Sequence, residues 1–332
     1  MTVPLRSAAA AAFHYGGGLA ALRWINRCGL RILMYHRFAD RAALARQCAH
    51  IRQHFHPVSM TAASDWLRDG RPLPPYALAV TVDDGYDDFR EAGSPVFAEY
   101  GIPVTVYLAT DFLDGKSWLW FDRVLYVFAN TTAGEANVEI PGGSVYRARM
   151  NGAETRRAAG QYLADLAVAW SPADRREVVA ALPRLLNVEM PEEAPAEYRP
   201  LGWDDVRKLA ASGVEFGAHT KTHPILSALT DLEELRDEVA GSKARIEAEL
   251  DRPVMHFCYP NGKMADIGPA AAEAVRSAGM RTAVTAEPGL NQAGQDPFLL
   301  LRIGADPGYE EKYFARSVAR AGRFFHAAGP VQ

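Results

Sequence analysis

Short apolar runs alternate along the chain with longer stretches in which apolar residues recur at helical spacing. Three of the runs are "LRILMYH" (30–36), "YALAVTV" (76–82) and "PVTVYLA" (103–109). Each is too short for an ordinary helix and is bounded by polar or turn-forming residues, so we expect buried strands. Strands that alternate with helices indicate an α/β fold with a mostly parallel sheet and helices outside it. The stretches between the runs predict helices at 41–55, 61–69 and 87–100.

Residues 112–200 interrupt this alternation. They contain the aromatic-rich "WLWFDRVLYVF", a hairpin pattern around Gly142-Gly143, two helical stretches and the acidic "MPEEAPAEYRP". We therefore expect an inserted α+β lid or subdomain. The alternation then resumes with a helix near Thr230, whose spacing to Glu233 is that of a capping box, and with strands in "VEFGA", "VMHFCYP", "RTAVT" and "LLLRIGA".

These patterns divide the chain into four parts. They are a basic N-terminal extension (1–29), a (β/α) part in two pieces (30–111 and 201–310), the insertion (112–200) and a basic, helical C-terminal tail (311–332).

The N-terminal extension combines arginines with a lack of acids, since the first acid is Asp40. His14 and three glycines break its apolar stretch, so no run reaches the roughly 18 residues of a membrane span. Arg23 and Arg27 follow that stretch, which makes a poor signal peptide. A packed helix is the favoured interpretation, and a helix lying on an anionic membrane surface is the alternative. We expect a cytoplasmic or membrane-peripheral protein.

The composition of the chain argues against some classes of function, such as nucleic-acid binding. The chain has 332 residues, of which 48% are hydrophobic and 23% charged, and its net charge is −4. This is the composition of a globular protein, and it offers no broad basic surface to a nucleic acid. The three cysteines, Cys28, Cys48 and Cys258, are widely spaced. They predict neither a disulfide framework nor a Cys-x-x-Cys metal site.

The stretch "AVTVDDGYDD" (79–88) places four carboxylates directly after a predicted strand. The C-terminal ends of parallel strands are where sites form in α/β folds. Asp87 and Asp88 fall in the first turn of the next helix, where acids are stabilised by the helix dipole. Asp83 and Asp84 lack that explanation, so we interpret them as a pair that holds a cation and moves a proton.

A second polar cluster, "GAHTKTH", contains His219 and His223 after another predicted strand. Their spacing allows two imidazoles to meet at one point, and two imidazoles with one carboxylate suit zinc and leave positions open for water. One aspartate of the pair can then bind the metal while its neighbour faces the attacking water. Histidines of an ordinary polar loop are the alternative, which the aspartate pair makes much weaker.

The two clusters together resemble the first two motifs of polysaccharide deacetylases, the family that removes N- or O-acetyl groups from carbohydrate polymers. "TVDDGYDD" is similar to the motif Thr-Phe-Asp-Asp-Gly, with Val82 in place of Phe, and "HTKTH" to the two-histidine motif. The resemblance covers about residues 30–111 and 200–303. It implies a distorted (β/α) barrel, commonly with seven strands, and a carbohydrate substrate. The roles it implies are catalytic base for Asp83 and ligands of a divalent metal, most commonly Zn²⁺, for Asp84, His219 and His223.

The first departure from the family's motifs concerns the arginine that orients the base. Its motif, Arg-x-Pro, corresponds here to "FCYPNG", with Cys258 at the arginine position. Arg302 in "LLLRIG" either supplies that guanidinium from elsewhere or is a surface or helix-pairing arginine. The loop of Tyr259, Pro260 and Asn261 is expected to offer a backbone N–H to an oxyanion.

The second departure concerns the general acid, a histidine in a Leu-x-x-His motif near the C-terminus of the family. Here Leu33-Met34-Tyr35-His36 matches it at the start of the chain. A closed barrel has no preferred first strand, so a circularly permuted order would return His36 to the same place. This order resembles poly-N-acetylglucosamine deacetylases of exopolysaccharide systems. A histidine satisfied at a strand end is the alternative.

The predicted function is metal-dependent hydrolysis of N-acetyl, or else O-acetyl, groups of a bacterial-type polysaccharide or glycan intermediate. The alternatives are a small-molecule amide or imide hydrolase on the same barrel and a carbohydrate-binding relative that has lost turnover. Trp118, Trp120 and Phe121 could stack on sugar rings, although anchoring the insertion is the favoured interpretation. Asp122 beside them has no predicted role.

Overall fold

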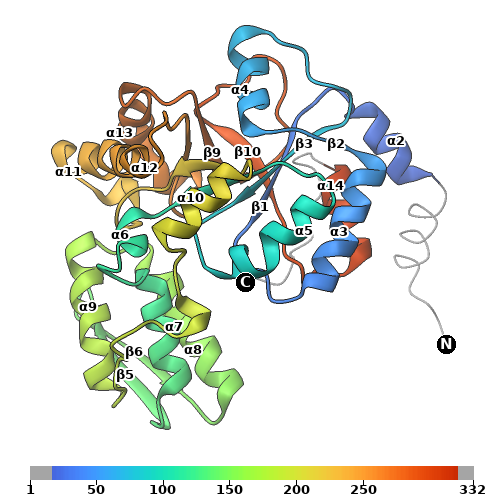
Figure 1. Cartoon of the computed structure of the whole chain (residues 1–332). Coiled ribbons are helices and arrows are strands. Elements are labelled where there is room, and N and C mark those ends of the chain that lie inside the picture. Colours follow the sequence, from blue (N-terminus) through green and yellow to red (C-terminus); the bar gives the residue numbers. More distant parts are fainter. Residues whose placement is uncertain (1–16, 321–332) are drawn as a thin grey trace, which may run out of the picture.

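A closed barrel of seven parallel strands forms the centre of the molecule (Figure 1). The computed structural model describes residues 17–320. The strands follow one another around the barrel in the order β1, β10, β9, β8, β7, β4, β3, and β3 pairs back with β1. The predicted distorted (β/α) barrel is therefore confirmed. The strands are β1 (Arg31–Tyr35), β3 (Ala77–Val82), β4 (Val104–Leu108), β7 (Glu215–Ala218), β8 (His256–Cys258), β9 (Thr282–Pro288) and β10 (Leu300–Gly304), and a short β2 (His56–Pro57) pairs with the start of β3.

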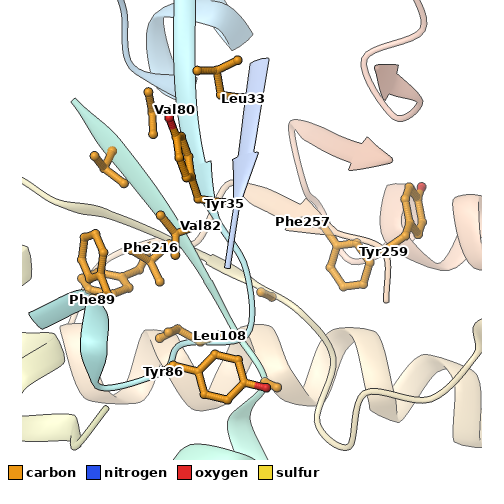
Figure 2. Close-up of a cluster of buried hydrophobic side chains, with 14 of the residues drawn as sticks. Leu33, Tyr35, Val80, Val82, Tyr86, Phe89, Leu108, Phe216, Phe257 and Tyr259 are labelled. Atoms are coloured by element: carbon orange, nitrogen blue, oxygen red, sulfur yellow. The ribbon is translucent and has the colours of Figure 1, made fainter. Parts of the chain in front are cut away.

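Alternate residues along a barrel strand belong to two different hydrophobic clusters, one outside the barrel and one inside it. Val80 and Val82 of β3 belong to the large cluster that packs under the outer helices, part of which Figure 2 shows. Ala77 and Ala79 of the same strand face inward and belong to a smaller cluster. Thr81 shares this inner face. Because both faces are covered, the strands read as nearly continuous apolar runs in the sequence.

Helices cover the outside of the barrel (Figure 1). No helix within residues 17–320 is long and apolar enough to cross a membrane. The predicted N-cap at Thr230 is wrong, because the carboxylate of Asp231 accepts a hydrogen bond from the Glu233 amide at 2.8 Å and so caps the helix one residue later. The helices are α2 (Gly18–Ile25), α3 (Arg41–His54), α4 (Met60–Asp69), a π-helical turn (Phe89–Gly93) leading into α5 (Ser94–Glu99), α6 (Thr110–Leu113), α10 (Trp203–Ala211), α11 (Leu232–Arg236), α12 (Ser242–Leu250), α13 (Met264–Ser277) and α14 (Glu311–Arg320).

The segment between β4 and β7 extends from one end of the barrel (Figure 1). Its hairpin turns at Gly142 and Gly143, whose φ values of +91° and +77° favour glycine. Val124, Phe128 and Leu163 pack in a cluster separate from the barrel cores. The predicted boundaries of this insertion stay a prediction. Its elements are α7 (Trp120–Asn130), β5 (Glu135–Ile140), β6 (Ser144–Arg149), α8 (Ala153–Ala167) and α9 (Pro172–Leu185).

Candidate active site and metal centre

The C-terminal ends of the barrel strands bring together polar side chains that are far apart in the sequence. Each one follows or ends a different strand, apart from two pairs that share a loop. Most of these side chains are buried, whereas the side chain of His36 is 38% exposed. They are His36 after β1, Asp83 and Asp84 after β3, His219 and His223 after β7, Cys258 at the end of β8 and Arg302 in β10.

Asp84, His219 and His223 face one another. The Nε2 atoms of His219 and His223 lie 3.3 and 3.5 Å from the same oxygen, Oδ1 of Asp84. The three side chains are buried, and their donor atoms lie within 4.8 Å of one another. Two imidazoles and a carboxylate so arranged can share one divalent cation and leave coordination positions open, which is a donor set that fits zinc.

A backbone carbonyl orients His219. Its Nδ1 lies 2.7 Å from the carbonyl oxygen of Cys258, which can only accept a hydrogen bond. Nδ1 therefore carries a proton, and Nε2 is the ring nitrogen that faces Asp84, as in metal-binding histidines. Burial, with a contribution from His219, lowers the pKa of His223 to about 4 and keeps that imidazole neutral. Burial opposes the charge of His219, but Cys258 and Asp84 outweigh it and hold the pKa of this imidazole well above its usual value. A metal that binds here would therefore displace a proton from His219.

Several residues of the site have a left-handed backbone conformation. The φ values are +73° at Asp84, +66° at Thr220 and +57° at His223. Such values are unfavourable for residues other than glycine and persist only where the surrounding structure imposes them. Gly85 has φ +85°, and a Cβ there would lie 2.8 Å from the Leu108 side chain. The backbone that carries the ligands is therefore held in one conformation before any ligand binds.

Asp83 is paired with Arg302 inside the barrel. Nη1 of Arg302 donates to Oδ1 and Nη2 to Oδ2, both at 2.7 Å, so the carboxylate is held by two parallel hydrogen bonds. Arg302 is 1% exposed and its other hydrogen bonds go to strand residues, so it is neither a surface nor a helix-pairing arginine. Burial opposes the charge of Asp83, but Arg302 outweighs it and holds the pKa of this carboxyl well below its usual value.

Strand register explains why Arg302 points inward. Leu300, two residues earlier in β10, belongs to the inner cluster, and side chains of a strand alternate between faces. Asp83 stands in the same relation to Thr81, whose Oγ1 accepts from Arg302 at 3.1 Å. The two charged groups therefore meet inside the barrel.

Cys258 completes the surroundings of Asp83. Its Sγ lies 3.4 Å from Oδ2 of Asp83 and 3.2 Å from Nη2 of Arg302. Burial raises the pKa of this thiol and so favours its neutral form. The position at which the family's arginine was expected thus holds a small side chain, and a guanidinium reaches the same carboxylate from β10.

His36 lies beside Asp83, with its Nε2 3.7 Å from Oδ2. The strand before it, β1, pairs with β3 on one side and with the last strand, β10, on the other. The first strand of the chain therefore closes the barrel and delivers His36 next to the two aspartates.

The loop after β8 offers fewer donors than expected. The N–H of Tyr259 donates to the carbonyl oxygen of Val284 at 3.2 Å, so it takes part in the barrel and is engaged. Pro260 has no N–H, which leaves Asn261 as the candidate donor of this loop. Asn261 has φ +58°, and its side chain is hydrogen-bonded to Asp266.

Tyr86 and Asp122 form a buried pair that the sequence did not reveal. The hydroxyl of Tyr86 donates to Oδ2 of Asp122 at 2.7 Å, and the guanidinium of Arg37 lies 4.0 Å from the centre of the Tyr86 ring. Burial raises the pKa of Asp122 to about 7; the Tyr86 hydrogen bond opposes the shift and the charge of Asp84 adds to it. The sequence did not predict this pair, because an acid in the first turn of a helix, such as Asp122, is usually exposed.

The aromatic residues at the start of the insertion divide between two roles. Trp118 stacks on Tyr198 at 5.5 Å, and Trp120 lies 5.0 Å from the guanidinium of Arg175, so both contact the insertion and the segment that leads out of it. Phe121 instead packs edge-on against His223, with ring centres 5.4 Å apart. The insertion therefore reaches the candidate metal centre through Phe121.

Solved structures of deacetylases share this fold. The Streptococcus pyogenes deacetylase PplD in complex with acetate has a TM-score of 0.58 and 13% identity, over 88% of this chain and 99% of that chain. IcaB from Ammonifex degensii has a TM-score of 0.56 and 18% identity, over 88% and 97%. The BpsB deacetylase domain from Bordetella bronchiseptica has a TM-score of 0.55 and 18% identity, over 84% and 96%. At these identities the likeness shows the fold.

The sequence itself matches the polysaccharide deacetylase family model over residues 158–283. This range begins within the predicted insertion and includes His219, His223 and Cys258, whereas Asp83 and Arg302 lie outside it. No curated protein sequence matches the chain. Within residues 158–283 the chain is therefore similar to polysaccharide deacetylases, and its barrel is the fold of the solved deacetylases.

Proposed function

We propose that the protein is a metal-dependent carbohydrate N-deacetylase. The observation that carries this proposal is the Asp83–Arg302 pair directly beside the donor set of Asp84, His219 and His223. One acid is held in the charged form, as a base must be, and its neighbour faces two imidazoles that suit a divalent cation. The donor set favours zinc.

Zinc bound by Asp84, His219 and His223 would supply a Lewis acid that activates a water molecule and polarises the acetyl carbonyl. Asp83 accepts the proton of the attacking water. Arg302 fixes both oxygens of this carboxylate, so its direction is set before the substrate arrives. The Asn261 amide is the candidate donor to the oxyanion of the tetrahedral intermediate.

His36 is placed to act as the general acid. When the C–N bond breaks, the sugar nitrogen leaves as an amine and needs a proton, and acetate is the other product. The His36 side chain lies at the exposed edge of the site, beside Asp83, where it can reach both the leaving group and solvent. The closure of the barrel by β1 supports the permuted motif order, because it puts this residue of the first strand next to those of β3 and β10.

The alternative of a carbohydrate-binding relative without turnover has the missing motif arginine as its best support. Arg302 weakens that support, since a guanidinium holds the carboxylate of Asp83 after all. We therefore favour an active enzyme.

The proposal is tested by acetate release from a panel of N-acetylated and O-acetylated glycans, with chelator and with added zinc. We expect zinc-dependent release from N-acetylated glycans. Release from O-acetylated members alone would make the protein an esterase, and an absence of release from every glycan at any zinc concentration would overturn the proposal.

A further inference from the structure

The two ends of the chain share an unusual charge pattern. Residues 1–30 contain three arginines and no acid, and residues 312–332 contain one lysine, three arginines and no acid. The protein as a whole has a net charge of −4. Two basic stretches without acids, in a protein of negative net charge, indicate that these stretches bind an anionic partner.

Within residues 17–320 the fold brings parts of these two stretches together, because α2 packs on α14 (Figure 1). Leu19 of α2 lies in one buried cluster with Ala319 of α14. Arg31 ties the two helices, donating from Nε to the carbonyl oxygen of Val318 at 2.9 Å and from Nη1 to that of Asn26 at 3.2 Å. The two helices therefore form one surface, which we call the α2–α14 face.

The part of this face formed by α2 is apolar and basic at once. Trp24 is 59% exposed and Ile25 is 65% exposed. The guanidinium of Arg27 lies 4.4 Å from the centre of the Trp24 ring and donates to the Trp24 carbonyl. An exposed tryptophan and isoleucine flanked by arginines are typical of a helix at a lipid–water interface.

Neighbouring elements add positive charge to the face and little negative charge. The last turn of α3 contributes Arg52. Burial together with the charge of Arg23 lowers the pKa of the neighbouring His54, so this imidazole is held in its neutral form. The acids Asp65 and Asp69 of α4 are already paired with an arginine, Arg281.

We infer that the α2–α14 face, centred on Trp24, Ile25 and Arg27, binds the surface of an anionic phospholipid bilayer. Trp24 and Ile25 supply apolar area for the headgroup region, and the arginines supply attraction to anionic lipids. The sequence favoured a packed helix in residues 1–29 and offered the membrane surface as the alternative. The structure combines the two, since α2 is packed on one side and exposes an apolar and basic surface on the other.

This inference sets an orientation for the enzyme. Strand β1 runs from Arg31, beside α2, to Tyr35, next to the candidate active site. The α2 part of this face and the site thus lie toward opposite ends of the barrel. A protein bound through this face presents its site to glycan strands in the aqueous phase rather than to sugars at the lipid surface.

The first test is co-sedimentation of the full chain with vesicles of phosphatidylcholine alone or mixed with phosphatidylglycerol. We expect binding that requires the anionic lipid and weakens at high salt. The variant Trp24→Ser/Ile25→Ser should bind at least about tenfold more weakly, since it removes two large apolar side chains. The matched control is Tyr162→Ser/Leu185→Ser, which changes two hydrophobic residues of the insertion that are 57% and 43% exposed and should bind as the unmodified protein does.

The second test locates the contact with a polarity-sensitive dye on Cys28. Cys28 is exposed, whereas Cys48 and Cys258 are buried, so labelling of the folded protein is selective. Anionic vesicles should shift the dye emission to the blue. Equal binding of the Trp24→Ser/Ile25→Ser variant, equal binding to neutral vesicles or no binding at all would overturn the inference. So would a dimer that forms without lipid and disappears in this variant, because it would assign the face to a second copy of the chain.

Discussion

Asp83 depends on Arg302 for its charge. A buried carboxylate is costly unless it is paired and hydrogen-bonded, and here both oxygens accept from one guanidinium. The pairing also leaves the thiol of Cys258 in contact with both groups. For the proposed base, a fixed direction matters more than a high pKa, because a bound metal would acidify the attacking water.

Replacing Asp83 by Asn tests the role of the base. We expect deacetylation to fall by at least about 10²-fold, because Asn cannot accept the proton of the attacking water. Bound zinc should remain near one equivalent, since Asp84, His219 and His223 are intact. Acetate release and zinc content of the same preparation measure the two effects. A fully active Asp83→Asn protein would sink the assignment of the base.

Removing the charge of Asp83 also leaves Arg302 buried without its partner. Losing one member of a buried pair costs about 3–5 kcal/mol, so the melting temperature should be recorded alongside the kinetics. The kinetic result counts only at a temperature at which the variant is folded.

Replacing His36 by Ala tests the general acid. The side chain is partly exposed, so the fold should tolerate the change, while turnover should slow by about 10²-fold for want of a proton donor to the leaving amine. His56, an exposed histidine that contacts the Pro75 carbonyl, gives the matched control His56→Ala, for which we expect normal rates. Normal rates for His36→Ala with zinc bound would contradict the permuted motif order.

Among the elements, α7 connects the insertion with the site. Its Phe121 packs on His223, and its Asp122 accepts from Tyr86, two residues beyond Asp84. We propose that residues 112–200 form an inserted unit that supports the metal ligands through these two contacts. The buried carboxyl group of Asp122 lies at this contact, so a change at this residue should alter the stability of the protein.

Replacing Asp122 by Asn should change the pH dependence of stability. The pKa of Asp122 is raised to about 7 in the folded protein, against roughly 4 in an unfolded chain. Between these values the folded state holds a proton that the unfolded state has lost, so this group makes the protein less stable as pH rises through that window. Asn has no proton to lose and can still accept from Tyr86.

We therefore expect Asp122→Asn to raise the melting temperature above pH 7 and to leave it nearly unchanged near pH 4. Thermal unfolding over a pH series measures this, with the exposed Asp165→Asn as the control. A melting temperature that drops equally at every pH would mean that the carboxyl group itself is needed and that its raised pKa carries no cost.

For the whole molecule, the candidate metal centre joins loops that follow different strands of the barrel. Asp84 follows β3, whereas His219 and His223 follow β7, on the far side of β4. An ion bound only by the folded arrangement stabilises it by mass action, by about 2.7 kcal/mol at a hundredfold excess over its dissociation constant. We expect zinc to raise the melting temperature by several degrees and the variant His219→Ala/His223→Ala to show no such rise. A rise of equal size in that variant would show that zinc acts elsewhere.

Local patterns in the sequence were enough to predict an α/β fold with a mostly parallel sheet and the candidate ligands, whereas the barrel was implied by the resemblance to a family. The strands appear as apolar runs because they are covered on both faces, and Asp83, Asp84, His219 and His223 stand out because each follows such a run within a short motif. These signals lie within a few neighbouring residues, so no knowledge of distant contacts is needed to read them.

Tertiary structure settled the features that depend on contacts between residues far apart in the chain. It placed Arg302 on Asp83, 219 positions earlier, and Tyr86 on Asp122, because strand order and register determine which inward side chains meet. It also joined α2 to α14 through Arg31, whose bond to Val318 spans 287 positions. A sequence shows which residue types are present and in what local order, but the closure of a barrel decides which of them become neighbours.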